Sequence, residues 1–230
     1  MKSKEVSSSQ SGIHPDLRKV ILKHSQNEWK QPIRTHTKLA FERFNRLREA
    51  AGFDGFILDA GCGTGQGTLQ LAKQFPHSLV VGIDQSEQRL GRGLLTFEQK
   101  TQLSAEPILI NNCMLIRAEV ADFWRLLKMD RLKPEKVFIL YPNPWPKPGH
   151  LMRRWHAHPV FPTLMALGSP IELRSNWKVY LQEFAQAVGL LTGVKPEVKL
   201  LPTKEFAGLY STPFEKKYFE SKHALWCLQT

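Results

Sequence analysis

Three carboxylates each stand where a predicted buried strand ends. Asp59 closes the first such segment, Asp84 ends the second, and Glu119 ends the third. In a parallel sheet, the carboxyl ends of the strands meet at one edge, and ligands bind there. The three acids therefore predict a row of hydrogen-bond acceptors; the alternative is three solvated strand ends beside a structural turn.

A glycine-rich turn, "GCGTGQG", follows the first of these strands. Gly61, Gly63 and Gly65 allow the backbone to take positive φ and to approach a ligand closely. The dinucleotide fingerprint G-x-G-x-x-G does not fit, because Gln66 or Thr68 stands where its last glycine belongs. The carboxylate ahead of the turn would also repel a pyrophosphate, so a nicotinamide-dependent oxidoreductase is disfavoured.

A ligand with an amine, a ribose and an adenine, but no phosphate, suits this row of acids. We expect Asp59 to meet the amine, Asp84 to accept from the ribose hydroxyls, and Glu119 to accept from the adenine amino group. Gln85 and Val120 directly follow two of these acids and complete the predicted site. S-adenosylmethionine has these three groups, and it is the predicted cofactor.

The segment "YPNPWPKPGHLMRRW" follows a predicted strand that ends at Tyr141. Prolines at alternate positions stiffen residues 142–148, which we name the proline shelf, and keep them out of the sheet. The shelf would fix Asn143 and Trp145 at a strand end, where an aromatic ring can stack on a base. Alternatively, Trp145 fills the core.

Strands and helices alternate through most of the chain, which predicts an α/β fold with a mostly parallel sheet and helices on both faces. The expected strands are 56–60, 79–84, 113–120, 136–141, 170–175, 196–201 and 224–229, and the expected helices are 36–51, 68–75, 86–101, 123–130, 159–168 and 176–189. The sheet is therefore expected to have seven strands, in a Rossmann-like arrangement.

The charge of the chain is unevenly distributed. The net charge is +11 over 230 residues, and residues 1–48 hold 11 Lys and Arg against 4 Asp and Glu. We expect a flexible basic arm over residues 1–35 and one domain over 36–230. A basic arm favours a polyanionic partner such as RNA, although it could equally be a solubilising tail.

Three dispersed cysteines, Cys62, Cys113 and Cys227, suit a reducing compartment, and we expect a cytoplasmic protein. The sequence has neither an apolar run long enough to span a membrane nor the apolar segment of a signal peptide. The histidines after the shelf match no metal-site spacing, so no metal is expected.

Five stretches together resemble the bacterial-type tRNA (guanine-N7)-methyltransferases: "DAGCGTG", "GID", "YPNPWPKPGHLMRRW", "RSNWKVY" and "TPFE". The resemblance runs in order from about residue 54 to the end. It implies a Rossmann-like methyltransferase fold, S-adenosylmethionine as methyl donor, a guanine in tRNA as acceptor, and a monomer or homodimer. Catalytic roles are implied for Asn143, which would also contact the donor, and for Trp145. The implied substrate-binding residues are Lys147, His150, Arg153, Arg154, Asn176, Thr212, Phe214 and Glu215.

Several positions depart from the family pattern: Asn143 and Asn176 stand where the family has aspartate, Gly149 where it often has Arg, and Met152 where it has Lys. An aspartate accepts from both donors of a guanine edge, whereas an amide also presents an NH2 group that faces those donors. Glu172 and Glu215 are the candidates to supply the missing carboxylate. Two alternatives stay open. The first is a methyltransferase of exocyclic amines (adenine N6 or guanine N2), because the segment that begins at Asn143 resembles the N-P-P-[YFW] loop of such enzymes. The second is an RNA-binding relative with weak catalysis.

Overall fold

The computed structural model of the chain describes residues 3–53, 55–95, 107–202 and 210–230. Residues 96–101 of one predicted helix therefore lie outside the described residues. The elements are, in chain order, α1 (Leu17–Gln26), α2 (Thr35–Ala50), β1 (Phe56–Ala60), α3 (Gln66–Gln74), β2 (Leu79–Asp84), α4 (Glu87–Leu95), β3 (Ile108–Ile110), β4 (Cys113–Arg117), α5 (Val120–Met129), β5 (Lys136–Leu140), the 3-10 helices η1 (Pro148–Arg153) and η2 (Trp155–Ala157), α6 (Phe161–Ala166), β6 (Ile171–Ser175), α7 (Lys178–Thr192), β7 (Val198–Leu200), α8 (Pro213–Glu220) and β8 (Trp226–Gln229).

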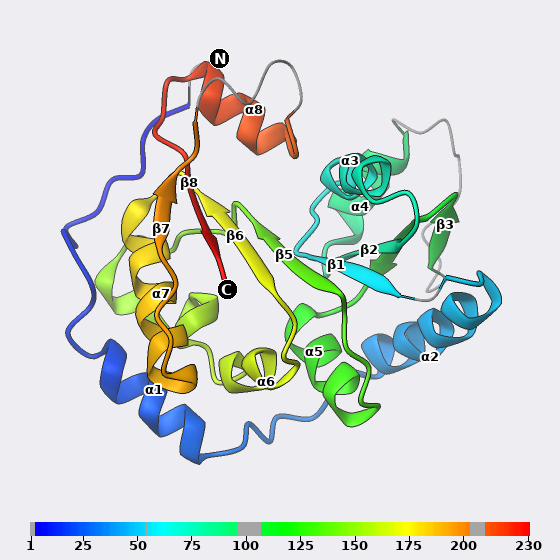
Figure 1. Cartoon of the computed structure of the whole chain (residues 1–230), viewed down its shortest axis with the longest axis horizontal. Helices are drawn as coiled ribbons and strands as arrows, with labels where there is room; N and C mark the ends of the chain where they lie inside the picture. Colours follow the sequence, from blue (N-terminus) through cyan, green and yellow to red (C-terminus); the bar gives the residue numbers. More distant parts are fainter. Residues whose placement is uncertain (1–2, 54, 96–106, 203–209) are drawn as a thin grey trace.

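One mixed sheet carries the fold, with the strand order β3-β4-β2-β1-β5-β6-β8-β7 (Figure 1). The five central strands pair in parallel, and the edges pair antiparallel through β3, β7 and β8. The predicted α/β class is confirmed. The described sheet has eight strands rather than the expected seven, because the short edge strand β3 gives too brief an apolar signal to separate from a turn.

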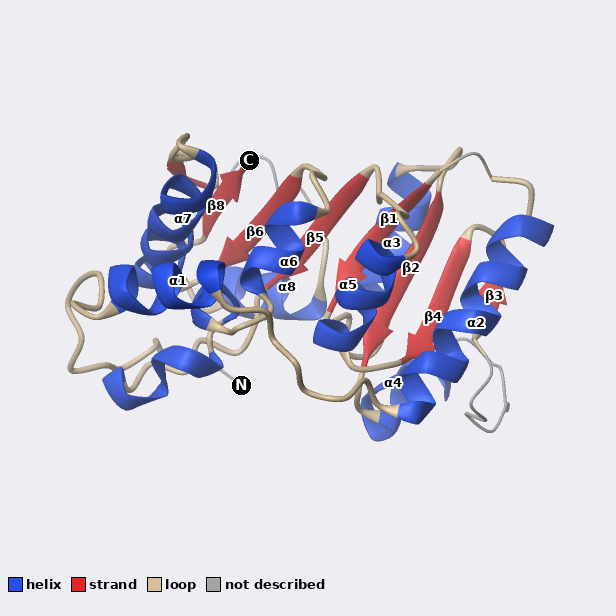
Figure 2. Ribbon diagram, turned by 90° about the horizontal axis from the view of Figure 1, so that it is seen from below, coloured by secondary structure: helices blue, strands red, loops and turns tan. Residues whose placement is uncertain are grey.

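Helices cover both faces of the sheet, so successive strand residues enter different cores (Figure 2). Leu58 and Val81 pack with the α2, α5, α6 and α7 side. Their neighbours Ile57 and Val80 pack with the α3 and α4 side. Burial on both faces explains why these strands read as continuous apolar runs rather than as alternating patterns.

The N-terminal segment lies along the domain, whereas the sequence predicted a flexible arm. It runs from beside α8 past α7, where α1 packs, and then crosses to α2 (Figure 1). Leu17 and Ile21, one helical turn apart, are each 1% exposed. Val20 is partly buried against the same core, so the apolar face of α1 packs on the domain.

Helix α7 continues past the predicted end at Gly189 and stops at Thr192, before Gly193 in the left-handed region (φ 80°). The prediction of its end was wrong because Gly189 serves packing rather than termination. A Cβ at that position would lie 3.1 Å from Cβ of Lys195. None of the helices within the described residues is both long and apolar enough to cross a membrane.

Replacing Ile21 by Ala should lower the free energy of unfolding by about 2–5 kcal/mol, because it empties a buried site between α1 and the domain. Lys23→Ala, an exposed change on the same helix, should stay within about 0.5 kcal/mol. Urea denaturation measures both. Equal stability of the Ile21 variant and the parent would show that α1 does not pack on the domain in solution.

Candidate active site

The glycine turn and the proline shelf lie side by side because β1 and β5 are neighbours. Asp59 of β1 is in register with Phe138 of β5, and the chain leaves each strand at the same edge of the sheet. From this point, β2 and β4 extend in one direction and β6 in the other. Such a reversal of strand order is where open α/β sheets bind ligands.

The glycine turn wraps the end of β2. The backbone N–H groups of Gly61 and Cys62 both donate to the Ile83 carbonyl, at 2.8 and 2.9 Å. Gly63 has φ 62°, and no protein atom lies within 4 Å of where its Cβ would be. Gly65, with φ 75°, packs so closely that a Cβ would lie 2.7 Å from Leu115. The turn thus packs tightly on one side and exposes backbone on the other.

Asp59 is a buried carboxylate at the centre of this region. It is 3% exposed, and its Oδ2 accepts a hydrogen bond from the Thr68 hydroxyl at 2.7 Å. Burial raises the pKa of Asp59 to about 6, and the nearby Asp84 charge adds to the rise. A bound cation would relieve this cost, as an amine next to the carboxylate would do.

Asp84 is equally buried, and both its oxygens accept hydrogen bonds. Oδ2 accepts from the Gly63 N–H at 3.0 Å, and Oδ1 accepts from the Ser86 N–H at 2.8 Å. The Arg89 guanidinium also lies 2.9 Å from Oδ1. A ribose hydroxyl bound at Asp84 would compete with Arg89, while the backbone bonds hold the carboxylate in place. Gln85 beside it is exposed.

Glu119 lies beyond the strand, contrary to the prediction that it ends one. Strand β4 stops at Arg117, and Glu119 precedes the first residue of α5, Val120, which is buried. Arg34 of the N-terminal segment approaches Glu119 at 3.4 Å. Burial raises the pKa of Glu119, and the Asp84 charge contributes. The Ala118 N–H donates to the Asp84 carbonyl at 3.1 Å, so Glu119 follows one residue after the point where the chain meets the end of β2.

Two backbone positions at the proline shelf are strained. Tyr141, directly before the shelf, and Trp145 within it have φ values of 53° and 45°, a region that bulky residues rarely adopt. The exposed Asn143 stabilises the turn, because its Oδ1 accepts from the Trp145 N–H at 3.4 Å. Such strain persists only where the surroundings fix it, and it gathers at functional sites.

Trp145 gathers two of the predicted substrate residues around its half-exposed ring. The Arg153 guanidinium lies 4.7 Å from the ring centroid, and the His150 ring meets it edge-on at 5.6 Å. Lys147 is exposed on the shelf nearby. These four side chains form a basic, aromatic surface, as the sequence suggested.

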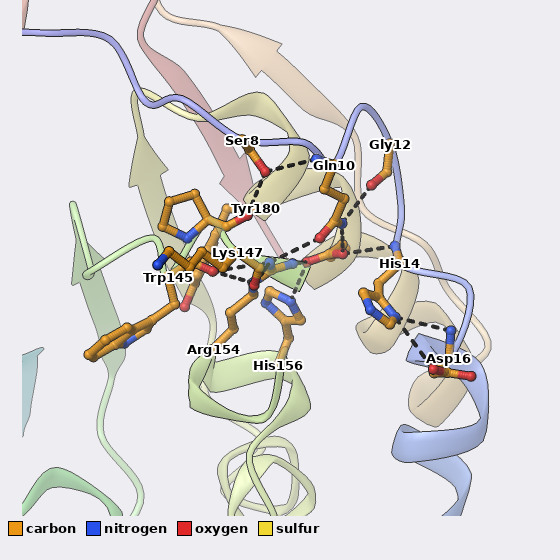
Figure 3. A network of polar contacts seen from close by, with 12 residues as sticks. Ser8, Gln10, Gly12, His14, Asp16, Trp145, Lys147, Arg154, His156 and Tyr180 are labelled. Carbon is orange, nitrogen blue, oxygen red and sulfur yellow. Dashed lines mark hydrogen bonds and ion pairs between the residues drawn. The ribbon is translucent and has the colours of Figure 1, made fainter. Parts of the chain in front are cut away.

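Arg154 does not join that surface, because it is fully buried beneath the shelf (Figure 3). Its guanidinium forms an ion pair with Glu183 of α7. It also donates to the Trp145 carbonyl at 3.1 and 3.2 Å and approaches the Lys147 carbonyl at 3.4 Å. The expectation that Arg154 binds substrate is therefore wrong: the residue supports the shelf from inside, while the Trp145 ring points away from it (Figure 3).

The N-terminal segment completes this buried network. The Gln10 amide accepts from Arg154 at 3.0 Å and donates to Glu183 at 2.6 Å. Ser8 donates to the Pro146 carbonyl of the shelf. Burial works against the ionised carboxylate of Glu183, but bonds from His156 and Arg154 prevail and lower its pKa to about 2. Sequence reasoning missed these residues, since no local pattern marks them.

A second polar cluster joins the start of the shelf to α8. Tyr141 Oη donates to Glu215 Oε1 at 2.9 Å, and Arg174 pairs with the same oxygen at 2.8 Å. Glu215 is fully buried, and its other oxygen accepts from the Ser211 N–H. Glu172 is likewise buried and pairs with Lys136 and Arg174. Neither glutamate is available to replace a missing carboxylate at a base, so that expectation does not hold.

The remaining predicted substrate residues lie near this cluster. Thr212 caps α8 by accepting from the Glu215 N–H at 3.0 Å, and Phe214 is 52% exposed on that helix. Asn176 is half-buried directly after β6, and its amide nitrogen contacts His223 at 3.1 Å. In the described part of the chain, no group of three or more His, Cys, Asp and Glu side chains could hold a metal.

Comparison with solved structures confirms the fold class. A solved structure described as "Structure of an Antibiotic Related Methyltransferase" superposes on this chain with a TM-score of 0.58 at 17% identity. The superposition covers 81% of this chain and 92% of that one. The 16S rRNA methyltransferase KamB superposes with a TM-score of 0.54 at 18% identity, covering 86% and 94%. The chain therefore has the fold of S-adenosylmethionine-dependent methyltransferases, with the acids and glycine turn at its switch point.

The family follows from the sequence comparison. The family described as "Putative methyltransferase" matches residues 54–228, and the chain belongs to it. The tRNA (guanine-N(7)-)-methyltransferase of Desulfitobacterium hafniense (strain Y51) is 29% identical over 70% of this chain and 72% of its own length. The enzyme of the same name from Nitrosococcus oceani is 27% identical over 81% and 72%. The predicted class, a methyltransferase, is confirmed.

Asp59 should make stability depend on pH. Its folded pKa of about 6 lies above its ordinary value of 3.8, so its contribution to stability is full at low pH and disappears as pH rises through about 6. Relative to the parent, Asp59→Asn should gain roughly 1 kcal/mol of unfolding free energy between pH 5 and pH 7.5. Urea denaturation at both pH values measures it. Stability curves of the parent and Asp59→Asn that run parallel over this pH range would contradict the argument.

Arg153 and Arg154 should differ sharply although they are adjacent. Arg154→Ala leaves Glu183 buried without its guanidinium partner and should cost about 3–5 kcal/mol of unfolding free energy. Arg153→Ala, at an exposed side chain, should change it by less than about 0.5 kcal/mol. Thermal and urea unfolding of the two variants test this. Similar costs for both would mean that the buried network does not form.

Proposed function

We propose that this protein transfers a methyl group from S-adenosylmethionine to N7 of a guanine in tRNA. One observation carries the proposal: the aromatic, basic proline shelf lies directly beside the buried acids, at the switch point of the sheet. The relatives named tRNA (guanine-N(7)-)-methyltransferase support the choice of base and of RNA.

The residues at the ends of β1, β2 and β4 fit the donor. Asp59 is a buried carboxylate whose raised pKa a cationic amine would lower again. Asp84 is held rigidly as an acceptor for ribose hydroxyls, and Glu119 is the third acid of the group. Gly63 offers open backbone at positive φ. S-adenosylmethionine supplies an electrophilic methyl group on a positively charged sulfur.

The shelf fits the chemistry of the acceptor. Guanine N7 carries a free lone pair, so no proton need be removed before it attacks, and the protein's task is to position the base and exclude water. The strained, proline-framed backbone keeps the Trp145 ring in one place, where a base can stack on it. Arg153 and Lys147 beside the ring are exposed cations suited to phosphates.

The overall charge suits a polyanionic substrate. A net charge of +11 attracts RNA at long range and makes binding dependent on salt. We infer that the protein acts on tRNA in the cytoplasm, as a monomer or homodimer; light scattering with and without tRNA would determine the oligomeric state.

Mass spectrometry of nucleosides tests the proposed function. Incubation with S-adenosylmethionine and unmodified tRNA should yield N7-methylguanosine. Trp145→Ala should lower kcat/KM by about 5- to 150-fold, since stacking contributes about 1–3 kcal/mol per base, and should leave donor affinity by calorimetry unchanged. N6-methyladenosine or N2-methylguanosine as the product would contradict the proposal, and so would donor binding without methylation of any tRNA.

A further inference from the structure

Two side-chain amides stand at the ends of the neighbouring strands β5 and β6. Asn143 follows β5 in the shelf and is exposed, and Asn176 directly follows β6 and is half-buried. The strands stay paired up to this point, because the Tyr141 N–H donates to the Arg174 carbonyl at 2.9 Å. How each amide is turned decides whether it offers a donor or an acceptor to a ligand.

The contacts of His223 determine the orientation of the Asn176 amide. His223 Nε2 lies 3.1 Å from the Ser3 carbonyl, which can only accept, so Nε2 carries the proton. In the neutral ring, Nδ1 is then an acceptor, and the Asn176 Nδ2 group donates to it at 3.1 Å. The ring is 7% exposed and stacks on Tyr218, with centroids 5.3 Å apart and planes at 17°. His223 is therefore held where it engages the NH2 of Asn176.

The two amides consequently present opposite groups. With its NH2 engaged, Asn176 has Oδ1 left to accept, and no donor in the described part of the chain contacts that oxygen. Asn143 is turned the other way, because its Oδ1 accepts from the Trp145 N–H and its NH2 stays available. Across the sheet, the order is thus the acids at β1, a donor at β5 and an acceptor at β6.

We propose that His223 is a positioning residue that turns Asn176 into an acceptor, so that the two amides recognise O6 and N1–H of guanine and do not use its N2 amine. This inference rests on the proposed function. Along one edge, guanine has N7, then the O6 acceptor, then the N1–H donor. The strand ends would offer matching partners in the same order: the methyl donor for N7, Asn143 Nδ2 for O6, and Asn176 Oδ1 for N1–H. Adenine reverses the last two groups, with an amine at C6 and an acceptor at N1, so it would meet donor with donor. The buried Glu172 and Glu215 are engaged elsewhere and do not alter this pattern.

Inosine separates this arrangement from recognition by a carboxylate, because inosine keeps O6 and N1–H but lacks the N2 amine. A tRNA transcript with inosine at the methylated position should be used within about threefold of the guanosine transcript, since no hydrogen bond is lost. Asn176→Asp, which can accept from both N1–H and N2, should prefer guanosine by about fivefold or more. A loss of tenfold or more with inosine in the parent protein would overturn the inference.

A double-mutant cycle tests the role of His223. His223→Phe keeps the ring that stacks on Tyr218 but removes the acceptor, and it should lower kcat/KM by about fivefold. In the Asn176→Asp background the same change should have little effect, because a carboxylate presents an oxygen in either orientation. His223→Gln restores an acceptor and should recover part of the activity. An equal loss in both backgrounds would mean that His223 acts only through stability, and would overturn the inference.

The tautomer can be measured without any substrate. Nitrogen-15 NMR of the ring in the intact protein should show the proton of His223 on Nε2 and none on Nδ1; protonation at Nδ1 would overturn the proposed orientation. Different results would reject the proposed function and the proposed role of His223. If the parent protein forms no N7-methylguanosine, the proposed function is rejected. If the parent forms N7-methylguanosine and the His223→Phe variant is fully active, only the role of His223 is rejected.

Discussion

The buried ion pair between Arg154 and Glu183 is the interaction on which the site depends. Burying both charges is expensive, and their attraction offsets that cost only where further hydrogen bonds satisfy both groups. Here the shelf carbonyls of Trp145 and Lys147 accept from the guanidinium, and the Gln10 amide joins both partners. One charge pair therefore links the shelf, helix α7 and the N-terminal segment. The half-exposed Trp145 ring, on which a base would stack, is therefore positioned by contacts that Arg154 makes to the Trp145 backbone from the buried side of the shelf.

The strand order of the sheet places the proline shelf beside the glycine turn. The glycine turn and the shelf follow β1 and β5, which are far apart in sequence and adjacent in space. On the β1 side, Asp59 and Asp84 are buried carboxylates, and burial raises the pKa of Asp59. Arg89 pairs with Asp84, but within the described residues no cation pairs with Asp59, so the Asp59 carboxylate is the group that a positively charged ligand would relieve most. The protein thus holds unfavourable charge at one strand end and strained backbone at the next.

How much of this could be predicted from sequence depends on the range of the interactions. The strands, the glycine turn and the stiffness of the shelf follow from local composition, and the structure has a strand in each predicted stretch. It differs in that β4 ends at Arg117, before Glu119, and in the additional edge strand β3. Arg154 reads as a second surface arginine after Arg153, because its carboxylate partner lies 29 positions later, on another element. Helix α1 packs through Leu17, Val20 and Ile21 on α7, an element distant in sequence. The engagement of Glu215 with Tyr141 and Arg174 is likewise non-local. Local sequence patterns thus predicted which residues lie near the candidate site. Contacts between distant elements decide which of those side chains are exposed at the site and which are buried.

Asn143 and Asn176 also affect how the site responds to the positive charge that methyl transfer moves from the donor to the base. In the proposed methyl transfer to N7, the positive charge would leave the sulfur beside the carboxylates of β1 and β2 and end on the base beside Asn143 and Asn176. A carboxylate at β6 would stabilise the cationic product more than the neutral base, by the same Coulomb attraction that holds the donor. A neutral amide lacks that attraction and binds base and product more equally. Such a site gives up part of the stabilisation of the developing charge, and it also holds the cationic product less tightly. Two asparagines in place of carboxylates therefore shift the site away from electrostatic stabilisation and towards hydrogen-bond geometry, which is why the orientation of each amide matters more here than it would for a symmetric carboxylate.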